Sequence, residues 1–192
     1  TVFCFFGRNE ALNGDAGLEG FKKNLAEMID GMRGQKYNGK SAPRIVVFSP
    51  IAHENLKSPH LPDGSVQNVN LEKYTAAMQA VCADKGVQFV DIFTPTKSLY
   101  ANAKEPLTMN GIHLLDHGNK ALAEVIVSRL FDKSAPADVV KLREAVLDKN
   151  LHWFNRYRVV DEYNVFGGRS RLNWDGFSNA DVMGREMEIF DV

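Results

Sequence analysis

The feature that most constrains the fold is an alternation of short apolar runs with helix-patterned segments between residues 2 and 131. The apolar runs, which are typical of buried strands, are residues 2–6, 44–49 and 87–92. The segments with apolar residues at three- and four-residue steps, which predict helices, are residues 17–33, 70–85 and 117–131. Because strand-helix-strand order places successive strands side by side and parallel, the sequence predicts an α/β sandwich around a parallel sheet.

This topology also predicts where a ligand would bind. In open parallel sheets the site lies beyond the carboxyl ends of the strands, so the loops that begin at Gly7, Ser49 and Thr94 should form it. The connection over residues 50–69 holds three prolines and two histidines. Such a long loop in a compact domain is usually functional or mobile.

Residues that commonly begin or end helices set the expected bounds. Asn70 would cap the second helix, and Gly86 would end it. Thr94-Pro95 is typical of a helix start, with proline in the first turn. Asp116 would be the N-cap of the helix over residues 117–131.

The composition narrows the classes to which the protein can belong. A length of 192 residues suggests one domain with an appendage. The net charge of −1 gives no basis for binding nucleic acid or an anionic membrane. No apolar run approaches the roughly 20 residues of a membrane span. Cys4 and Cys82 both lie in apolar stretches, so we expect buried free thiols.

The pattern changes after residue 133, and we assign residues 134–192 to a C-terminal extension of a main domain that comprises residues 1–133. The extension should be helical over residues 136–153 and 180–192. Between these helices lies an aromatic, arginine-rich segment. Its aromatic residues, expected to pack against the main domain, are Trp153, Phe154 and Tyr157.

Two short motifs carry the candidate chemistry, and the first follows the first strand as Phe6-Gly7-Arg8-Asn9-Glu10. A glycine directly after a strand lets the backbone turn sharply. The amide of Asn9 can then donate into the space above the sheet, where a donor aimed at a developing oxyanion is worth a few kcal/mol. The alternative is that Gly7 and Asn9 only form a turn, since asparagine is a common turn residue.

The second motif is Asn110-Gly111-Ile112-His113, on the loop before the last helix of the main domain. Imidazole titrates near neutral pH and can act as a general base. Asn110 lies three residues before His113, a spacing that lets its side chain meet the imidazole and hold it. The alternative is a structural or simply exposed histidine, which a single histidine more often is.

In this order along the chain, the two motifs resemble those of the SGNH or GDSL hydrolase family. The third sequence block of that family is Gly-x-Asn-(Asp/Glu) after a strand, and Gly7-Arg8-Asn9-Glu10 matches it. The fifth block is Asp-x-x-His before the last helix, and Asn110 to His113 match its spacing and its histidine. Residues 153–170 resemble an extension found in large multidomain GDSL-like proteins of planctomycetes and related bacteria.

The resemblance implies a three-layer α/β/α sandwich and an ester hydrolase of the acylhydrolase or carbohydrate-esterase type. His113 would be the general base, Asn9 an oxyanion-hole donor and Gly7 the residue that shapes the loop of that hole. The implied substrate is a small ester or an acetylated carbohydrate, with no cofactor and no metal. Further domains of the same polypeptide are expected. Related proteins are often exported, and an export signal would lie upstream.

The sequence departs from the family in two ways. None of its serines lies in the Gly-Asp-Ser block, and the glycine of the second block is absent too. We therefore expect a nucleophile outside this sequence, a cut inside the sheet at Thr1, and a missing strand-helix-strand unit of about 30 residues or more. The second departure is Asn110 in place of aspartate. An amide can accept a hydrogen bond from imidazole but brings no charge, so a backbone carbonyl is the alternative partner for the ring.

Other interpretations stay open at this point. The protein could be a non-catalytic binding or structural module on the same fold, which Asn110 and the absent nucleophile favour. A flavodoxin-like cofactor binder would need a phosphate-binding loop after a strand, and Gly167-Gly168-Arg169 lacks that context. A group of acidic and histidine residues in the long loop could line a substrate cleft or hold a metal, although its spacing matches no strong zinc pattern. These residues are His53, Glu54, His60 and Asp63.

Overall fold

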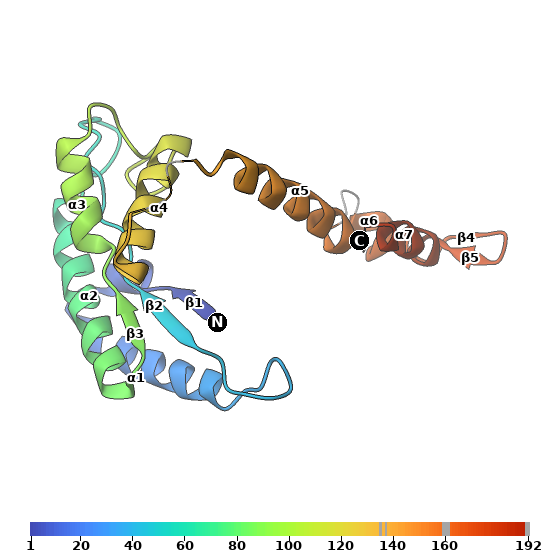
Figure 1. The fold of residues 1–192 in the computed structure, drawn as a ribbon, viewed down its shortest axis with the longest axis horizontal. Coiled ribbons are helices and arrows are strands. Elements are labelled where there is room, and N and C mark those ends of the chain that lie inside the picture. Colours follow the sequence, from blue (N-terminus) through green and yellow to red (C-terminus); the bar gives the residue numbers. More distant parts are fainter. Residues whose placement is uncertain (135, 137, 159–161, 191–192) are drawn as a thin grey trace. The chain divides into compact units, whose positions relative to one another are not determined.

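The structure, a computed structural model, describes residues 1–134, 136, 138–158 and 162–190. The chain divides into two compact units, Thr1–Ala135 and Pro136–Val192. The elements of the first unit, in chain order, are β1 (Val2–Phe5), η1 (Glu10–Asn13), α1 (Gly14–Arg33), β2 (Ile45–Phe48), α2 (Ser65–Lys85), β3 (Gln88–Val90), α3 (Phe93–Asn102) and α4 (Asp116–Phe131) (Figure 1). Strands and helices therefore alternate in the order that the sequence predicts.

The strands of the first unit form the predicted parallel sheet, in the spatial order β1-β2-β3. Val2 of β1 lies opposite Ile45 of β2, and Val46 of β2 lies opposite Gln88 of β3. The central strand, β2, is buried along its whole length, as expected for a strand that is covered on both faces. Successive side chains of a strand point to opposite faces, so each face of the sheet receives its own set of apolar residues.

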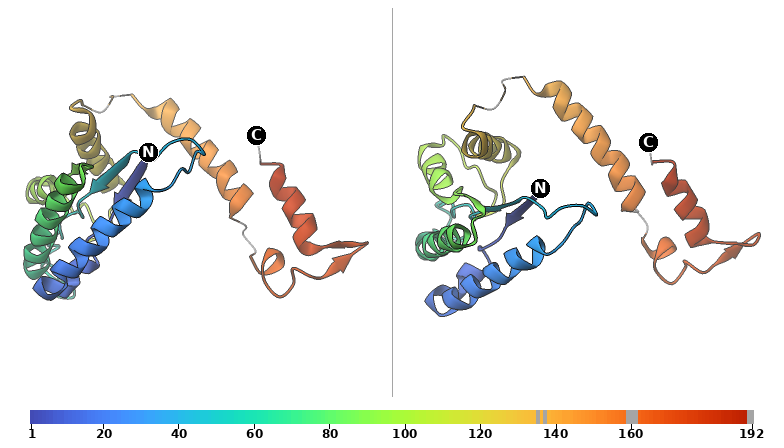
Figure 2. Two further views of the ribbon diagram at one scale, coloured as in Figure 1. Left: turned by 90° about the horizontal axis from the view of Figure 1, so that it is seen from below. Right: turned by 60° about the horizontal axis from the view of Figure 1, so that its bottom comes forward.

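Helices cover both faces of this sheet, which confirms the α/β/α layers that the family resemblance implies (Figure 2). On one face, Ile45 and Val47 belong to a core shared with α1 and α2. The buried residues that these two helices add to that core are Phe21, Leu25, Ile29, Leu71, Tyr74, Met78 and Cys82. On the other face, the core residues are Val46, Phe48, Val90 and Ile92, packed against Leu122, Val125, Ile126 and Leu130 of α4. Cys4 and Cys82 are buried and form no disulfide, as predicted.

The starts of α2 and α4 differ from the prediction. α2 begins at Ser65 and not after Asn70, because Asp63 accepts hydrogen bonds from the N–H and the hydroxyl of Ser65, at 2.9 and 2.7 Å. The predicted end of α2 at Gly86 is confirmed. Asp116 is the first residue of α4 and not its N-cap, so its charge lies in the first turn, where the helix dipole favours it.

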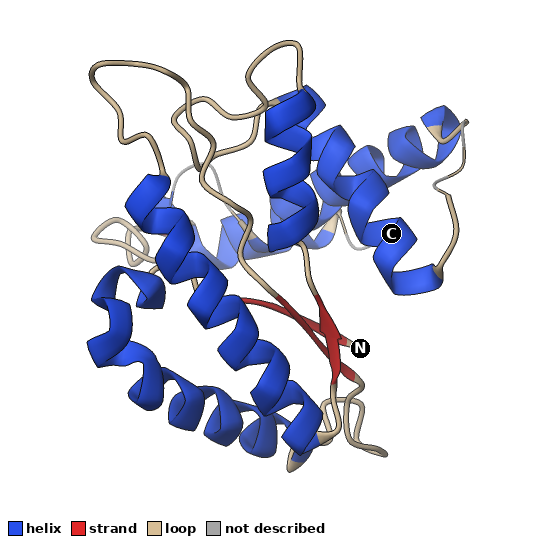
Figure 3. Ribbon diagram, turned by 90° about the vertical axis from the view of Figure 1, so that its left-hand side faces the viewer, coloured by secondary structure: helices blue, strands red, loops and turns tan. Residues whose placement is uncertain are grey.

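The chain leaves the parallel strands at one end of the sheet, and the long loops lie beyond that end (Figure 3). The loop that follows β2 runs to residue 64, and it contacts the loop that precedes α4. The contact is a hydrogen bond at 3.0 Å from the N–H of Glu54 to the carbonyl of Gly111. Segments that are far apart in the sequence therefore meet beyond the carboxyl ends of the strands.

The second unit contains the predicted helical extension, with shifted bounds. α5 covers Val140–Tyr157 in place of the predicted residues 136–153, of which residue 137 lies outside the described residues. The predicted helix over residues 180–192 corresponds to α7 (Asn179–Glu188), and residues 191 and 192 also lie outside the described residues. Within the described part of the chain, no helix has both the length and the apolar character needed to span a membrane.

The second unit also contains elements that the sequence analysis does not predict. These are the short helix α6 (Glu162–Val165) and a hairpin of β4 (Asn173–Trp174) and β5 (Phe177–Ser178). The turn of the hairpin is Asp175-Gly176, with φ values of 47° and 89°. Asp-Gly between two short strands is the typical signal for such a turn, and it is legible in the sequence.

The glycine pair weighed as a phosphate loop has a packing explanation. A Cβ on Gly167 would lie 2.6 Å from Cδ2 of Tyr163, and a Cβ on Gly168 would lie 2.6 Å from its hydroxyl oxygen. Close approach of the tyrosine ring therefore requires both glycines. The aromatic residues of α5 are about half exposed within this structure, and the rings of Trp153 and Tyr157 lie 5.7 Å apart between centroids. Their packing against the main domain stays a prediction.

Candidate active site

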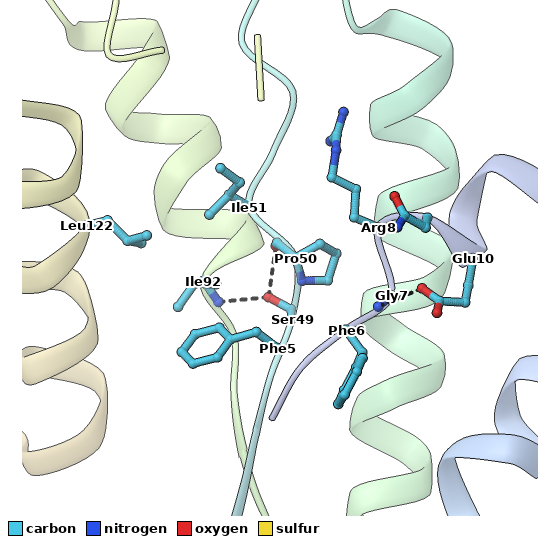
Figure 4. A pocket seen from close by; sticks show the side chains of 11 residues that line it. Phe5, Phe6, Gly7, Arg8, Glu10, Ser49, Pro50, Ile51, Ile92 and Leu122 are labelled. Atoms are coloured by element: carbon cyan, nitrogen blue, oxygen red, sulfur yellow. Dashed lines mark hydrogen bonds between the residues drawn. The ribbon is translucent and has the colours of Figure 1, made fainter. Parts of the chain in front are cut away.

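A pocket of about 360 Å³ lies beyond the carboxyl ends of the strands, where the topology places a ligand site (Figure 4). Its walls come from the end of β1, from the segments that follow the three strands of the first unit, and from one side chain of α4. The lining residues are Phe5, Phe6, Gly7, Arg8, Asn9, Glu10, Ser49, Pro50, Ile51, Ile92 and Leu122. The pocket therefore combines apolar walls with the polar residues of the first motif.

Gly7 makes the turn from β1 into the wall of this pocket. Its φ is +99°, a conformation that residues with a side chain rarely adopt. A Cβ at this position would lie 2.9 Å from Sδ of Met78. The N–H of Gly7 donates to Oε2 of Glu10 at 3.0 Å, so the turn is closed by its own motif. Gly7 thus shapes the loop, while its N–H is already occupied.

Asn9 presents the free donor of the first motif. Its backbone carbonyl accepts the N–H of Leu12 at 3.2 Å, which fixes the residue at the start of η1. Its side chain is exposed, does not cap that helix and makes no hydrogen bond to a residue that the structure describes. The side-chain amide is therefore available to a molecule in the pocket that Asn9 lines.

Ser49 lines the same pocket but has the surroundings of a structural residue. It is buried, and its hydroxyl oxygen accepts the N–H groups of Ile92 and Phe93, each at 2.9 Å. The hydroxyl itself lies 3.2 Å from the carbonyl oxygen of Pro50, to which it donates. These bonds join the end of β2 to the start of α3, so they explain a serine at this position without any catalytic role.

Asn110 and His113 are brought together as their spacing predicts. Oδ1 of Asn110 accepts the N–H of His113 at 3.0 Å and that of Ile112 at 3.3 Å. The same amide contacts Nδ1 of the imidazole, at 3.1 Å from Oδ1 and 3.0 Å from Nδ2. His113 is exposed and is not among the residues that line the pocket. The amide therefore holds one ring nitrogen and leaves the other, Nε2, without a partner in the described part of the chain.

His53 links the two motifs, a role that the sequence analysis misses. It is 5% exposed, and its Nδ1 accepts a hydrogen bond from Nη2 of Arg8 at 3.4 Å. On the other side, Gly111 has φ +86°, and a Cβ there would lie 2.5 Å from Nε2 of His53. The imidazole therefore lies between the residue before Asn9 and the residue after Asn110. The only signal in the sequence is a titratable residue placed directly after an apolar strand and its Pro-Ile-Ala extension.

Burial sets the protonation of this link. Burial lowers the pKa of His53 below its ordinary value, and the positive charge of Arg8 lowers it further. Burial also lowers the pKa of Arg8, whose guanidinium stays charged because its ordinary pKa is so high. At neutral pH His53 is therefore a neutral ring that accepts from Arg8 through Nδ1 and carries its proton on Nε2.

The two acidic residues of the long loop, Glu54 and Asp63, accept hydrogen bonds from different parts of the chain. The carboxylate of Glu54 accepts hydrogen bonds from Leu107 and Thr108. The carboxylate of Asp63 accepts the N–H and hydroxyl of Ser65, which lower the pKa of Asp63. Among the described residues, no group of three or more histidine, cysteine, aspartate or glutamate side chains could hold a metal ion.

No protein-family model matches this sequence, and no curated protein sequence does so either. Among solved structures, Axe2, an acetylxylan esterase from Geobacillus stearothermophilus, superimposes with a TM-score of 0.51 at 13% identity, over 71% of this chain and 62% of that chain. The acetyl xylan esterase AlAXEase gives a TM-score of 0.49 at 17% identity, over 68% of this chain and 66% of that chain. The lipase/acylhydrolase from Enterococcus faecalis gives 0.48 at 22% identity, over 71% and 64%.

The likeness to Axe2 concerns the fold, because identity is only 13%. This chain spans 62% of the length of Axe2, so the match covers part of that enzyme. The layers and the parallel sheet agree with the fold that the family resemblance implies. The chain thus has an α/β/α fold similar to that of Axe2, as the resemblance to the SGNH/GDSL hydrolases implies.

Proposed function

We propose that this chain is part of an ester hydrolase that uses a serine nucleophile, a histidine base and an asparagine donor. The observation that carries the proposal is the free side-chain amide of Asn9 in a pocket beyond the carboxyl ends of the strands. Such a donor would stabilise the oxyanion of a tetrahedral intermediate that forms in this pocket. The fold shared with Axe2, an acetylxylan esterase, supports the same reaction class.

His113 would act as the general base. With Oδ1 of Asn110 accepting from Nδ1–H, the free nitrogen Nε2 is the proton acceptor. In the acylation step it would take the hydroxyl proton of the serine as the oxygen attacks the ester carbonyl. It would then return that proton to the departing alcohol, which leaves an acyl-enzyme. Water would release the acyl group by the same sequence of proton transfers.

The nucleophile in this proposal lies outside the 192 residues. Ser49, the serine that lines the pocket, has its hydroxyl bonded within the protein. Exposed aromatic side chains of β1 and of the residue after it also support a further segment of the same polypeptide. Phe3, Phe5 and Phe6 are 50%, 52% and 46% exposed, a set of aromatic side chains that a covering element would bury.

The proposed substrate is a small ester or an acetylated carbohydrate. The pocket supports it, since its lining combines apolar side chains such as Ile51 and Leu122 with the polar side chain of Asn9. Axe2 is described as an acetylxylan esterase, which makes an acetylated xylo-oligosaccharide a reasonable first substrate to test.

The test is hydrolysis of p-nitrophenyl acetate and acetylated xylo-oligosaccharide by the full-length protein, beside its His113→Ala variant. We expect activity in the natural protein, a loss of about 10³-fold or more in the variant, and labelling of one serine by a fluorophosphonate probe. His60→Ala, in the exposed part of the long loop, is the matched control and should keep full activity. Equal rates with and without His113 would refute its role as base. Absence of both turnover and probe labelling would favour the non-catalytic module.

A further inference from the structure

Glu54 has a buried carboxylate that accepts hydrogen bonds from uncharged N–H and O–H groups. The residue is 5% exposed. Its oxygens accept the N–H of Leu107 at 3.0 and 3.1 Å, the N–H of Thr108 at 2.7 Å and the hydroxyl of Thr108 at 2.6 Å. None of the ion pairs between described residues includes Glu54. A buried charge without a cation is stable only if such hydrogen bonds stay in place, so the carboxylate fixes the backbone that it contacts.

These bonds fix the loop that carries Asn110 and His113. The hydroxyl of Thr108, which donates to Glu54, also accepts the N–H of Gly111 at 2.9 Å. The N–H of Glu54 donates to the carbonyl of Gly111 at 3.0 Å. Both backbone polar groups of Gly111 are therefore hydrogen-bonded. Glu54 and Thr108 therefore bracket the turn from which the side chains of Asn110 and His113 project.

The opposite side of Glu54 is anchored to the helices. The strap, defined as residues 52–54, is held by α3 through the N–H of Ala52, which donates to Oγ1 of Thr96 at 2.9 Å. It is held by α2 through Asn68, whose Oδ1 accepts the N–H of His53 at 2.8 Å and whose Nδ2 donates to the His53 carbonyl at 2.9 Å. The strap thus transmits the position of two packed helices to the loop.

We propose that Glu54 is a positioning residue of the catalytic site, which sets the place of His113 by holding the loop over residues 107–113 against the strap. The proposal rests on the proposed function, because it acts through His113 as the base. A general base works only within hydrogen-bond reach of the proton it takes, and a displacement of about 1 Å can cost about 100-fold in rate. A carboxylate that no substrate touches can in this way control turnover.

The first test measures positioning without any reaction. Hydrogen exchange of the peptide that spans residues 107–114 is followed in the full-length protein and in Glu54→Gln, which keeps the shape but removes the charge. We expect exchange of Thr108 and Gly111 to become about tenfold faster or more. Glu72→Gln, which removes an exposed glutamate from α2, is the control and should leave this peptide unchanged. Unchanged exchange in Glu54→Gln would overturn the proposal.

The second test separates positioning from simple loss of structure. With p-nitrophenyl acetate, Glu54→Gln should lower kcat by about 10- to 100-fold and leave KM nearly unchanged, because the pocket residues stay in place. Thr108→Val, which removes the bridging hydroxyl, should lower kcat in the same way, and Thr108→Ser should restore it. If Glu54→Gln does not unfold cooperatively, and is therefore not properly folded, the two variants at residue 108 test the positioning role in its place.

The two proposals fail differently. A natural protein without esterase activity would refute the proposed function, while the exchange experiment would still show whether Glu54 holds the loop. An active protein whose Glu54→Gln variant has the natural kcat would refute positioning alone. A rise in KM without a fall in kcat would also refute it, since that result belongs to a residue that binds substrate.

Discussion

Asn110 and His113 are joined through both backbone and side chain: one carboxamide oxygen accepts the N–H of His113 at 3.0 Å and lies 3.1 Å from Nδ1 of its ring. The contact orients the imidazole of His113 as an aspartate at position 110 would. It does not supply the negative charge that would stabilise an imidazolium in the proposed mechanism. The structure therefore combines a well-oriented histidine with a weak electrostatic partner.

Asn110→Asp should raise activity. The aspartate keeps the acceptor oxygens for the N–H groups of Ile112 and His113 and adds a charge beside the ring. In serine proteases the reverse exchange costs about 10⁴ in turnover, so we expect a rise in kcat of about tenfold or more. The measurement is kcat on p-nitrophenyl acetate in the full-length protein. Asn119→Asp, which adds the same charge on α4, is the control, and an unchanged kcat in Asn110→Asp would contradict the prediction.

Asn9→Ala should lower kcat by about 10²- to 10³-fold, the usual effect of losing one oxyanion-hole donor. KM should change little, since the donor acts mainly on the transition state. Folding should be unaffected, because the side chain of Asn9 makes no hydrogen bond to any described residue. Asn13→Ala, at the other end of η1, is a control of the same residue type whose side chain also makes no capping hydrogen bond. A loss of activity that is equal in both variants would count against a specific role for Asn9.

Gly7→Ala should destabilise the protein by about 1–3 kcal/mol, because the site has φ +99° and the added Cβ would lie 2.9 Å from Met78. Gly20→Ala should have the opposite effect. That glycine lies inside α1 with open space around it, and alanine is the better helix former by about 0.5–1 kcal/mol. Urea unfolding curves of the two variants give both free energies. Destabilisation of similar size at both glycines would show that the turn at Gly7 has no special requirement.

The stability of the protein should fall as the pH drops below about 6.5, the ordinary pKa of histidine. Burial and Arg8 lower the pKa of His53 in the folded state, while the carbonyl of Pro62 and the carboxylate of Asp63 partly oppose them. The unfolded chain therefore binds a proton at a pH where the folded protein does not, so acid favours unfolding. Urea midpoints at pH 5 and pH 7.5 test this, and His53→Asn should reduce the difference. The control is His60→Asn, and an equal pH dependence in all three proteins would disprove the assignment.

Both thiols should resist modification in the folded protein. Burial, with a smaller effect of Cys4, raises the pKa of Cys82 to about 11, and burial also raises that of Cys4. Because the thiolate is the reactive form, Ellman's reagent at pH 8 should react slowly with the native protein. In about 8 M urea, which unfolds most small proteins, both thiols should react fully. Rapid reaction of one thiol in the native state would show that β1 or α2 opens locally.

Hydrophobic periodicity was sufficient to predict the helix and strand layers of the main domain. The continuous apolar residues of β2 and the stripes of α2 and α4 report burial directly, and parallel topology follows from their order along the chain. Sequence reasoning failed where a local hydrogen bond overrides periodicity. Asp63 starts α2 at Ser65, ahead of the apparent cap at Asn70.

The sequence by itself determined the residue types of the candidate site and the pairing of Asn110 with His113, because contacts over three residues are set by local backbone geometry. Only the tertiary structure decided how the two motifs are joined. His53 and Glu54 are more than 40 residues from each of them, and a contact such as Glu54 to Thr108 depends on how the loops meet beyond the sheet. A spacing rule cannot find such a contact, since burial of an unpaired carboxylate becomes favourable only when folding brings its donors to it.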